Sequence, residues 1–276
     1  MSLYDNSISL NAPPNYDSLV NTSLSKSEKI NNLIKKYEIA PLFSEKLDIL
    51  CDYDIVLLCD DSGSMNTPLD DNSGHSTRWE ELKSVVKMVI NIATIFDDDG
   101  IDIYFLNREN YYNVTSDECI SNIFNELPYG STPLTEKLYN IFQKYKFNEK
   151  PVLIIIATDG LPTNNGLLDL YNFNRCVSNK NHNKFYISFL ACSDDDCDIE
   201  YLNELDRNVP NVDTLDDYNS EKKEVLRIQG ADFKYTFSEH IVRLLLGPIC
   251  LELDSLDEFP IVSNYNYTNK YNCIIL

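Results

Sequence analysis

The chain has 276 residues, of which 43% are hydrophobic, so it is long enough to bury one large core. Its formal net charge of −21 argues against a nucleic-acid-binding protein, because such proteins need a basic surface to displace counterions from phosphates. The eight cysteines are scattered, and no segment approaches about eighteen continuous apolar residues. We therefore expect a cytoplasmic protein without a disulfide framework or a membrane-spanning helix.

Three segments are expected along the chain: a disordered N-terminal arm over residues 1–28, a folded domain over 29–250 and a C-terminal tail over 251–276. The arm is rich in Ser and Asn and has no hydrophobic period, which is typical of disorder. Within the domain, short runs of branched apolar residues predict strands that are covered on both faces. In chain order these strands are 55–59, 100–107, 151–160 and 184–192, with 111–114 as a short edge strand.

Helices are predicted where apolar residues recur at steps of three and four. One such run extends from Trp79 to Phe96, and Thr77 with Glu80 gives it a capping-box start. The alternation of strands and helices predicts a Rossmann-like, three-layer αβα fold with a mostly parallel central sheet and one short antiparallel edge strand. Further helices are expected over 115–127, 133–145 and 172–179, and the remainder up to about residue 247 looks helical and irregular.

Five oxygen-bearing side chains stand at the ends of predicted strands or just before a predicted helix. Asp60, Ser62 and Ser64 follow strand 55–59, Asp159 ends strand 151–160, and Thr132 precedes helix 133–145. Ligands of an open parallel sheet bind at the carboxyl ends of its strands, so we expect these side chains to converge there. Two carboxylates and three hydroxyls, with no His or Cys, suit a hard divalent ion such as Mg²⁺ or Mn²⁺.

The spacing of these residues resembles that of the von Willebrand factor A domain with its metal-ion-dependent adhesion site. That family has the pattern D-x-S-x-S, then a separate Thr, then a separate Asp. Here the pattern is DDSGS at 60–64, Thr132 in GSTPL and Asp159 in ATDG. The resemblance spans about residues 52–247, so it covers most of the chain and neither of the two ends.

The resemblance implies a six-stranded, mainly parallel sheet and a metal site. Ser62, Ser64 and Thr132 would bind the metal directly, and Asp60 and Asp159 would act through water. One coordination position would be left for a Glu or Asp of a partner protein, because an ion with mainly neutral ligands stays electrophilic. A non-enzymatic protein-binding adaptor follows from this arrangement.

The N-terminal arm contains the P-P-x-Y motif as Pro13, Pro14 and Tyr16. Paired prolines pre-form a polyproline II segment, which WW domains bind between aromatic side chains. We expect this arm to recruit WW-domain proteins, with ubiquitin ligases as an example by motif analogy. A plain linker is the alternative interpretation.

The last four residues, CIIL, resemble a C-a-a-X prenylation box with Cys273 as the modified residue. The preceding stretch has no polybasic cluster, so we expect any membrane association through a prenyl group to be reversible. The localisation expected is cytoplasmic, with peripheral membrane association through this lipid.

Two other functions stay open. The first is a Mg²⁺-dependent phosphatase or hydrolase with Asp60 as its nucleophile, although haloacid-dehalogenase-like enzymes have D-x-D where this chain has Ser62 in the third position. The second is a scaffold whose metal site is vestigial and whose two ends recruit partners. A serine hydrolase is disfavoured, because no G-x-S-x-G motif surrounds Ser64.

Overall fold

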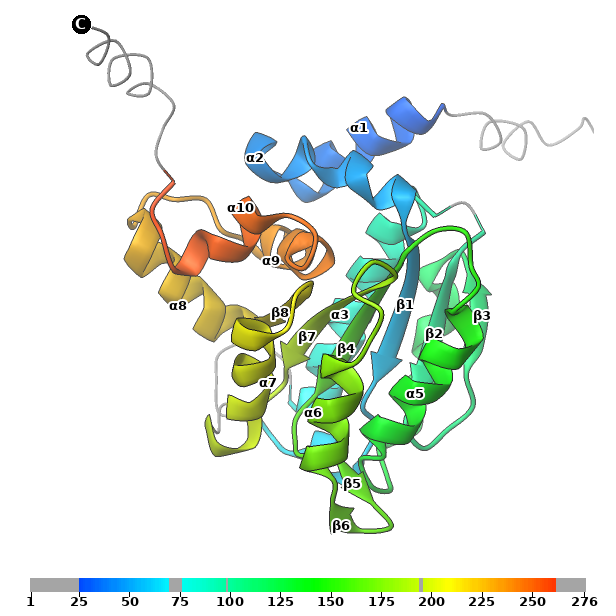
Figure 1. Ribbon diagram of the computed structural model, residues 1–276. Coiled ribbons are helices and arrows are strands. Elements are labelled where there is room, and N and C mark those ends of the chain that lie inside the picture. Colours follow the sequence, from blue (N-terminus) through cyan, green and yellow to red (C-terminus); the bar gives the residue numbers. More distant parts are fainter. Residues whose placement is uncertain (1–24, 70–75, 98, 194–195, 262–276) are drawn as a thin grey trace, which may run out of the picture.

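The computed structural model describes residues 25–69, 76–97, 99–193 and 196–261, and a six-stranded sheet lies at its centre (Figure 1). The strand order is β3-β2-β1-β4-β7-β8, with β3 antiparallel to β2 at one edge and all other pairs parallel. The expected fold class, an αβα fold with a mostly parallel sheet and a short antiparallel edge strand, is confirmed. The strands are β1 Asp54–Cys59, β2 Ile101–Phe105, β3 Tyr111–Val114, β4 Val152–Thr158, β7 Phe185–Ala191 and β8 Val212–Leu215.

The central strands are apolar along their whole length because both of their faces are covered. All seven residues of β4 are buried. In β1, Leu57 packs into the core on one face of the sheet and Leu58 into the core on the other. Neighbouring residues of a strand point to opposite faces, so a doubly covered strand needs a continuous apolar run.

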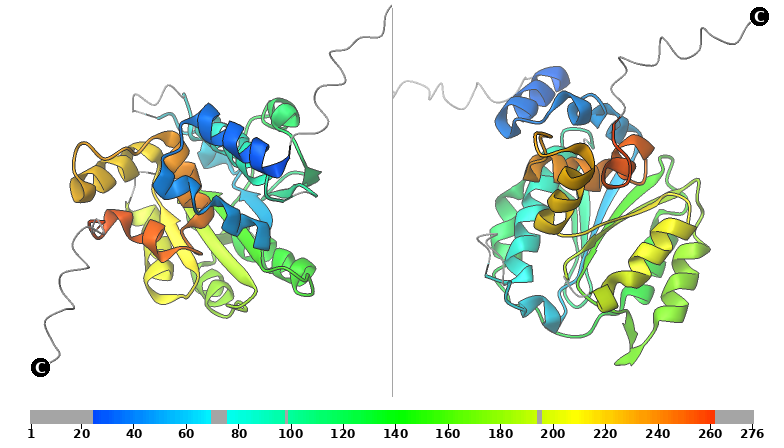
Figure 2. Two further views of the ribbon diagram at one scale, coloured as in Figure 1. Left: turned by 90° about the horizontal axis from the view of Figure 1, so that it is seen from above. Right: turned by 90° about the vertical axis from the view of Figure 1, so that its left-hand side faces the viewer.

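Two layers of helices cover the sheet, one on each face (Figure 2). Leu82 and Ile241 belong to the core beneath α3 and α9, and Leu138 and Phe173 belong to the core beneath α5 and α6. The predicted N-cap of α3 is confirmed, because the Thr77 hydroxyl accepts a hydrogen bond from the backbone of Glu80, but the Glu80 carboxylate accepts from the backbone N–H of Ser76, so the expected capping box is not formed in full. The helices on the first face include α3 Arg78–Ala93, α8 Tyr218–Gln229 and α9 Phe237–Leu246, and those on the second are α5 Leu134–Tyr145, α6 Leu170–Ser178 and α7 Asp196–Asn208.

The packed unit extends beyond the boundaries expected from the sequence. A capping box at Ser25 starts the first helix inside the segment 1–28, and Leu253 is fully buried beyond residue 250. The backbone N–H of Ala40 donates to Glu239 of α9 at 2.9 Å, which joins the N-terminal helices to the C-terminal part of the core. The added elements are α1 Lys26–Tyr37, α2 Pro41–Ser44, η2 Leu47–Asp52, α10 Leu251–Asp254 and η5 Ser255–Asp257.

Other elements also differ from their prediction. The helix expected over 115–127 is shorter, because η4 and α4 cover only residues 117–123, and Leu127 beyond them is 74% exposed. Strand β8 was not predicted, and neither was a small hairpin of β5 and β6. None of the helices in the described part of the chain is both long and apolar enough to cross a membrane. The short elements are η3 Gly63–Asn66, η4 Asp117–Cys119, α4 Ile120–Ile123, β5 Thr163–Asn164 and β6 Leu167–Leu168.

Candidate metal site

Asp60 is fully buried directly after β1, and backbone and side-chain donors hold its carboxylate in place. The backbone N–H of Ser62 donates to Oδ1 at 2.8 Å, and the Thr158 hydroxyl donates to Oδ2 at 2.7 Å. Thr158 is the last residue of β4, the strand that pairs with β1. Both carboxylate oxygens are therefore engaged within the protein, and the orientation of Asp60 is fixed from the loop after β1 and from the end of β4.

The serine loop is joined to the acid at the end of β4 through Ser64. The hydroxyl oxygens of Ser62 and Ser64 lie 3.0 Å apart, and Ser64 donates to Oδ1 of Asp159 at 2.8 Å. The loop can present both hydroxyls because η3 turns the chain immediately after Ser62. The convergence of this loop with Asp159, expected from the carboxyl ends of parallel strands, is thus present in the structure.

Thr132 lies in a neighbouring loop that is fastened to the serine loop through the backbone. Gly63 donates its N–H to the carbonyl of Gly130 at 3.2 Å. Gly130 has a φ of +92°, and a Cβ at this position would lie 2.4 Å from Oδ1 of Asn107, so glycine is required here. Thr132 is 8% exposed, and its hydroxyl makes no hydrogen bond to the four other predicted ligands.

Asp61 is a buried residue of the site that the sequence reasoning did not single out. Its Oδ1 accepts from the backbone N–H of Asn107 at 2.8 Å, and its Oδ2 accepts from Nε of Arg108 at 2.7 Å. The Arg108 guanidinium lies 4.9 Å from the ring centroid of Trp79. Asp61 points away from the serines toward the end of β2, so it positions the loop while Asp60 faces β4.

Arg78 is the second residue that the sequence did not reveal. Its guanidinium donates to Oδ2 of Asp159 at 2.8 Å and to the hydroxyl of Ser193 at 3.0 Å. The Arg78 side chain is 16% exposed and that of Asp159 is fully buried, so solvent screens this ion pair weakly. The only available signal was its position, directly after the Thr77 cap of the helix that follows the serine loop.

The electrostatics of the site favour a cation. Burial and the neighbouring charge of Asp159 raise the pKa of Asp60 to about 7. Arg78 contacts only one of these two buried carboxylates. A carboxylate whose pKa is raised in this way gains stability from any further positive charge, since the charge favours its ionised form.

The donor set fits a hard divalent ion. The groups that meet here are carboxylates and hydroxyls, with Thr132 held one loop away, and Mg²⁺ and Mn²⁺ prefer such oxygen ligands. Asp60 already uses both of its oxygens inside the protein, which agrees with the indirect role that the family resemblance implies for it.

No protein-family model matches the sequence, and no curated protein matches it significantly. Solved structures with a similar fold include a von Willebrand factor type A protein from Catenulispora acidiphila, at 13% identity and a TM-score of 0.42 over 70% of this chain and 43% of that one. The ArnB paralog VWA2 from Sulfolobus acidocaldarius has 17% identity and a TM-score of 0.32 over 51% of this chain and 34% of that one. The PilB minor pilin from Streptococcus sanguinis has 13% identity and a TM-score of 0.39 over 59% of this chain and 57% of that one. The chain thus spans less than two thirds of each of these structures.

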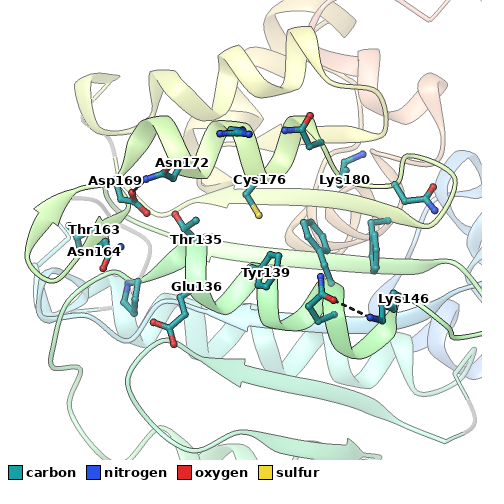
Figure 3. A pocket seen from close by; sticks show the side chains of 17 residues that line it. Thr135, Glu136, Tyr139, Lys146, Thr163, Asn164, Asp169, Asn172, Cys176 and Lys180 are labelled. Atoms are coloured by element: carbon teal, nitrogen blue, oxygen red, sulfur yellow. Dashed lines mark hydrogen bonds between the residues drawn. The ribbon is translucent and has the colours of Figure 1, made fainter.

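A hollow of about 650 Å³ lies between α5 and α6 on the second face of the sheet (Figure 3). Cys176 and Lys180 of its wall come from α6 and the turn after it, and Tyr139 comes from α5. Burial lowers the pKa of Lys180 to about 8, and its amine donates to the carbonyl of Pro210 at 2.6 Å. None of the five predicted metal ligands lines this hollow, but Thr163 of its wall accepts a hydrogen bond from the backbone N–H of Thr132 at 3.1 Å, so one end of the hollow adjoins the loop of Thr132.

The predicted sites in the two ends of the chain lie outside the described residues. These are Pro13, Pro14 and Tyr16 for WW-domain binding, and Cys273 for lipidation. They stay predictions from the sequence.

Proposed function

We propose that this protein is a non-enzymatic protein-interaction module that binds Mg²⁺ or Mn²⁺ at the Asp60 site and recognises an acidic residue of a partner there. The observation that carries the proposal is the hydrogen-bonded chain from Ser62 through Ser64 to Asp159, beside the buried carboxylate of Asp60. Ser62, Ser64 and Thr132 would hold the ion directly, and the two aspartates would hold it through water. The ion would supply an electrophilic centre for an outside Glu or Asp.

The burial of Asp60 supports binding over the hydrolase alternative. A carboxylate nucleophile needs a free oxygen that faces the substrate, whereas Asp60 is 0% exposed and both of its oxygens accept hydrogen bonds. We expect no turnover of a generic phosphoester such as p-nitrophenyl phosphate with millimolar Mg²⁺. Turnover that disappears in Asp60→Asn would instead favour the hydrolase.

The metal site is tested by the melting temperature and by titration calorimetry with MgCl₂ or MnCl₂ alone. Binding to the native state raises the melting temperature, and the rise should be absent in the double variant Asp60→Ala with Ser62→Ala. Asp52→Ala, which removes an exposed carboxylate outside the site, is the matched control and should keep the full response. An equal response in the double variant would mean that the ion binds elsewhere.

The acidic partner is tested by affinity capture with the wild type and the double variant, each with Mg²⁺ or with a chelator. We expect a set of proteins that is retained only by the wild type with Mg²⁺, and whose retention is restored when Mg²⁺ is added back. Retention of the same proteins by the double variant with chelator would favour the scaffold whose metal site is vestigial.

We propose that the N-terminal end of the chain recruits WW-domain proteins and that the C-terminal end attaches the protein to a membrane. The Pro13, Pro14 and Tyr16 motif would bind WW domains, ubiquitin ligases among their carriers, and a pulldown that does not weaken with Tyr16→Ala would defeat this role. Prenylation at Cys273 would give a cytoplasmic protein reversible membrane association. The intact mass from a eukaryotic host should carry the prenyl increment in the wild type and lose it in Cys273→Ser.

A further inference from the structure

The hollow between α5 and α6 has the size of a site for a small molecule (Figure 3). Its volume is about 650 Å³, and ligand pockets in proteins usually measure about 300–1,000 Å³. The proposed function makes no use of this hollow. The kind of molecule that it suits depends on the side chains of its wall.

One side of the wall is an aromatic face of α5. Tyr139, Phe142 and Lys146 follow one another at steps of three and four residues, so they share one face of the helix. Tyr139 is 54% exposed, which leaves its ring open to a ligand. Phe142 and Phe185 are nearly buried and their ring centroids lie 4.6 Å apart, so they close the base of the hollow. These rings provide an apolar surface on which a planar ring can stack.

One end of the hollow is basic. Lys146, Arg175 and Lys180 line the hollow, and none of them forms an ion pair within the described part of the chain. The two acids of the wall, Glu136 and Asp169, lie at the end opposite to Lys146 and Lys180 (Figure 3). A positive region is thus present in a chain whose formal net charge is −21.

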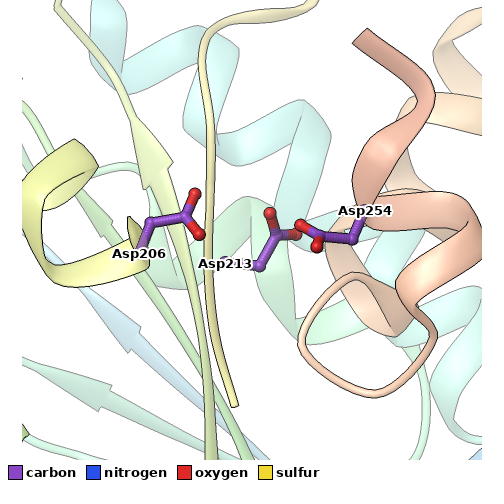
Figure 4. A group of neighbouring side chains, drawn as sticks. All are labelled: Asp206, Asp213 and Asp254. Carbon is purple, nitrogen blue, oxygen red and sulfur yellow. The ribbon is translucent and has the colours of Figure 1, made fainter. Parts of the chain in front are cut away.

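Acidic side chains gather elsewhere in the molecule. Beside the edge strand β8, the carboxylates of Asp206, Asp213 and Asp254 meet, with one oxygen from each within 4.8 Å of the others (Figure 4). Among the described residues, no carboxylate comes within ion-pair distance of the basic residues of the hollow. The basic end therefore lacks a counter-charge from the protein.

Lys180 carries its charge in a buried position. It is 4% exposed, and its amine donates to the carbonyl of Pro210 at 2.6 Å and lies 3.2 Å from Nδ1 of His182. Neither of these groups is an anion, and burial lowers the pKa of Lys180 to about 8. A buried ammonium without a counter-charge gains free energy from an anion that reaches it, because the anion favours the charged form.

We propose that this hollow binds a small aromatic carboxylate, whose ring stacks on Tyr139 and whose anionic group binds at the basic end, beside Lys180. The ring would provide most of the buried area, and the anionic group would fix the orientation of the ligand. This inference goes beyond the proposed function. The basic end lies opposite to Thr163, where the hollow adjoins the loop of Thr132 (Figure 3).

The test is a fluorescence titration of the full chain with 8-anilinonaphthalene-1-sulfonate and with its uncharged analogue N-phenyl-1-naphthylamine. Both probes fluoresce in apolar surroundings, but only the sulfonate is an anion. We expect a single sulfonate probe per chain, bound more tightly than the analogue and displaced by 1-naphthoate. Lys180→Met should weaken the binding of the sulfonate about tenfold or more and leave that of the analogue unchanged, whereas a purely structural role would weaken both.

Further variants separate the hollow from other surfaces and from misfolding. Tyr139→Ala should weaken the binding of both probes, and Tyr171→Ala, which removes an exposed tyrosine of α6 outside the hollow, should weaken neither. Arg175→Met, at an exposed position, should weaken only the sulfonate and replaces Lys180→Met if that variant does not fold. Asp60→Ala with Ser62→Ala should keep the binding of the sulfonate, so a failure of the metal site is distinguishable from a failure of this one.

Three results would overturn the inference. The first is a wild type that binds no sulfonate probe, or several with similar affinity. The second is a bound probe that 1-naphthoate does not displace or that Tyr139→Ala does not weaken. The third is a loss in Lys180→Met, or in Arg175→Met, that is as large for the uncharged analogue as for the sulfonate.

Discussion

Replacing Arg78 by methionine should destabilise the metal-free protein and tighten the binding of Mg²⁺. Arg78 provides two charge-assisted hydrogen bonds, and the one to Asp159 joins side chains that are 16% and 0% exposed. A hydrogen bond to a charged group contributes about 1.5–3 kcal/mol, and the substitution also leaves a buried carboxylate unpaired. We therefore expect the free energy of unfolding to fall by about 2–3 kcal/mol without metal, which lowers the melting temperature by roughly 4–12 °C.

Saturating Mg²⁺ should recover most of this loss, because the ion supplies the positive charge that Asp159 then lacks. In the thermodynamic cycle, the recovered free energy equals the gain in Mg²⁺ affinity, so about 1.5–2 kcal/mol corresponds to roughly 10–30-fold tighter binding. Denaturant unfolding with and without Mg²⁺ gives one side of the cycle, and calorimetry gives the other.

The matched control is Arg207→Met, which breaks an exposed ion pair with Glu200 whose partners are 60% and 57% exposed. Such pairs contribute about 0–1 kcal/mol, so this variant should change little and should bind Mg²⁺ like the wild type. The reasoning is refuted if Arg78→Met loses the same stability with and without Mg²⁺, or if it binds Mg²⁺ more weakly than the wild type.

Three further predictions concern residues around the site and in the core. Asp61→Asn should cost about 3–5 kcal/mol in denaturant unfolding, because it leaves the buried guanidinium of Arg108 without its counter-charge; a loss below about 1 kcal/mol would contradict this. Gly130→Ala should cost about 1–3 kcal/mol, since its φ of +92° and the nearby Asn107 both exclude a side chain, and it should weaken the Mg²⁺ response. His240 is buried and neutral, and burial lowers its pKa to about 3, so the unfolded chain binds a proton that the folded protein does not. Its contribution is full above the unfolded pKa of about 6.5 and is lost toward pH 3, so acidification from pH 7 to 5 should cost about 2 kcal/mol more in the wild type than in His240→Gln.

The long central strands, and the site residues that directly follow them, were predictable because their signal is local. A doubly covered strand such as β4 has a continuous apolar run, and polar residues that follow it directly, such as Asp159, must lie at the carboxyl edge of the sheet. The same reasoning brought the serine loop after β1 to that edge. Periodicity was also sufficient for α3 and α5, in which apolar residues recur over several turns.

The remaining features depend on contacts that no local pattern records. Strand β8 has four residues, and the inward position next to Leu215 is the acid Asp213, so its alternation does not resemble a strand. Arg78 pairs with a residue 81 positions away, and nothing in its neighbours indicates that partner. The helix expected over 115–127 ends early, at residue 123, and Leu127 at the end of the predicted range is exposed and has no core to pack against.

The hydrogen bond from the backbone N–H of Ala40 to the Glu239 carboxylate has a consequence for the synthesis of the protein. The two residues are 199 positions apart, so a ribosome that adds about 5–20 residues per second needs roughly 10–40 s to make the second after the first. During this delay Phe43, Leu47 and Leu50, all fully buried in the finished protein, lack the helix α9 against which they pack. A nascent chain halted before residue 236 should therefore expose an apolar surface that binds a hydrophobic dye or a chaperone. Completing the chain, so that α9 can pack against these residues, should abolish that binding.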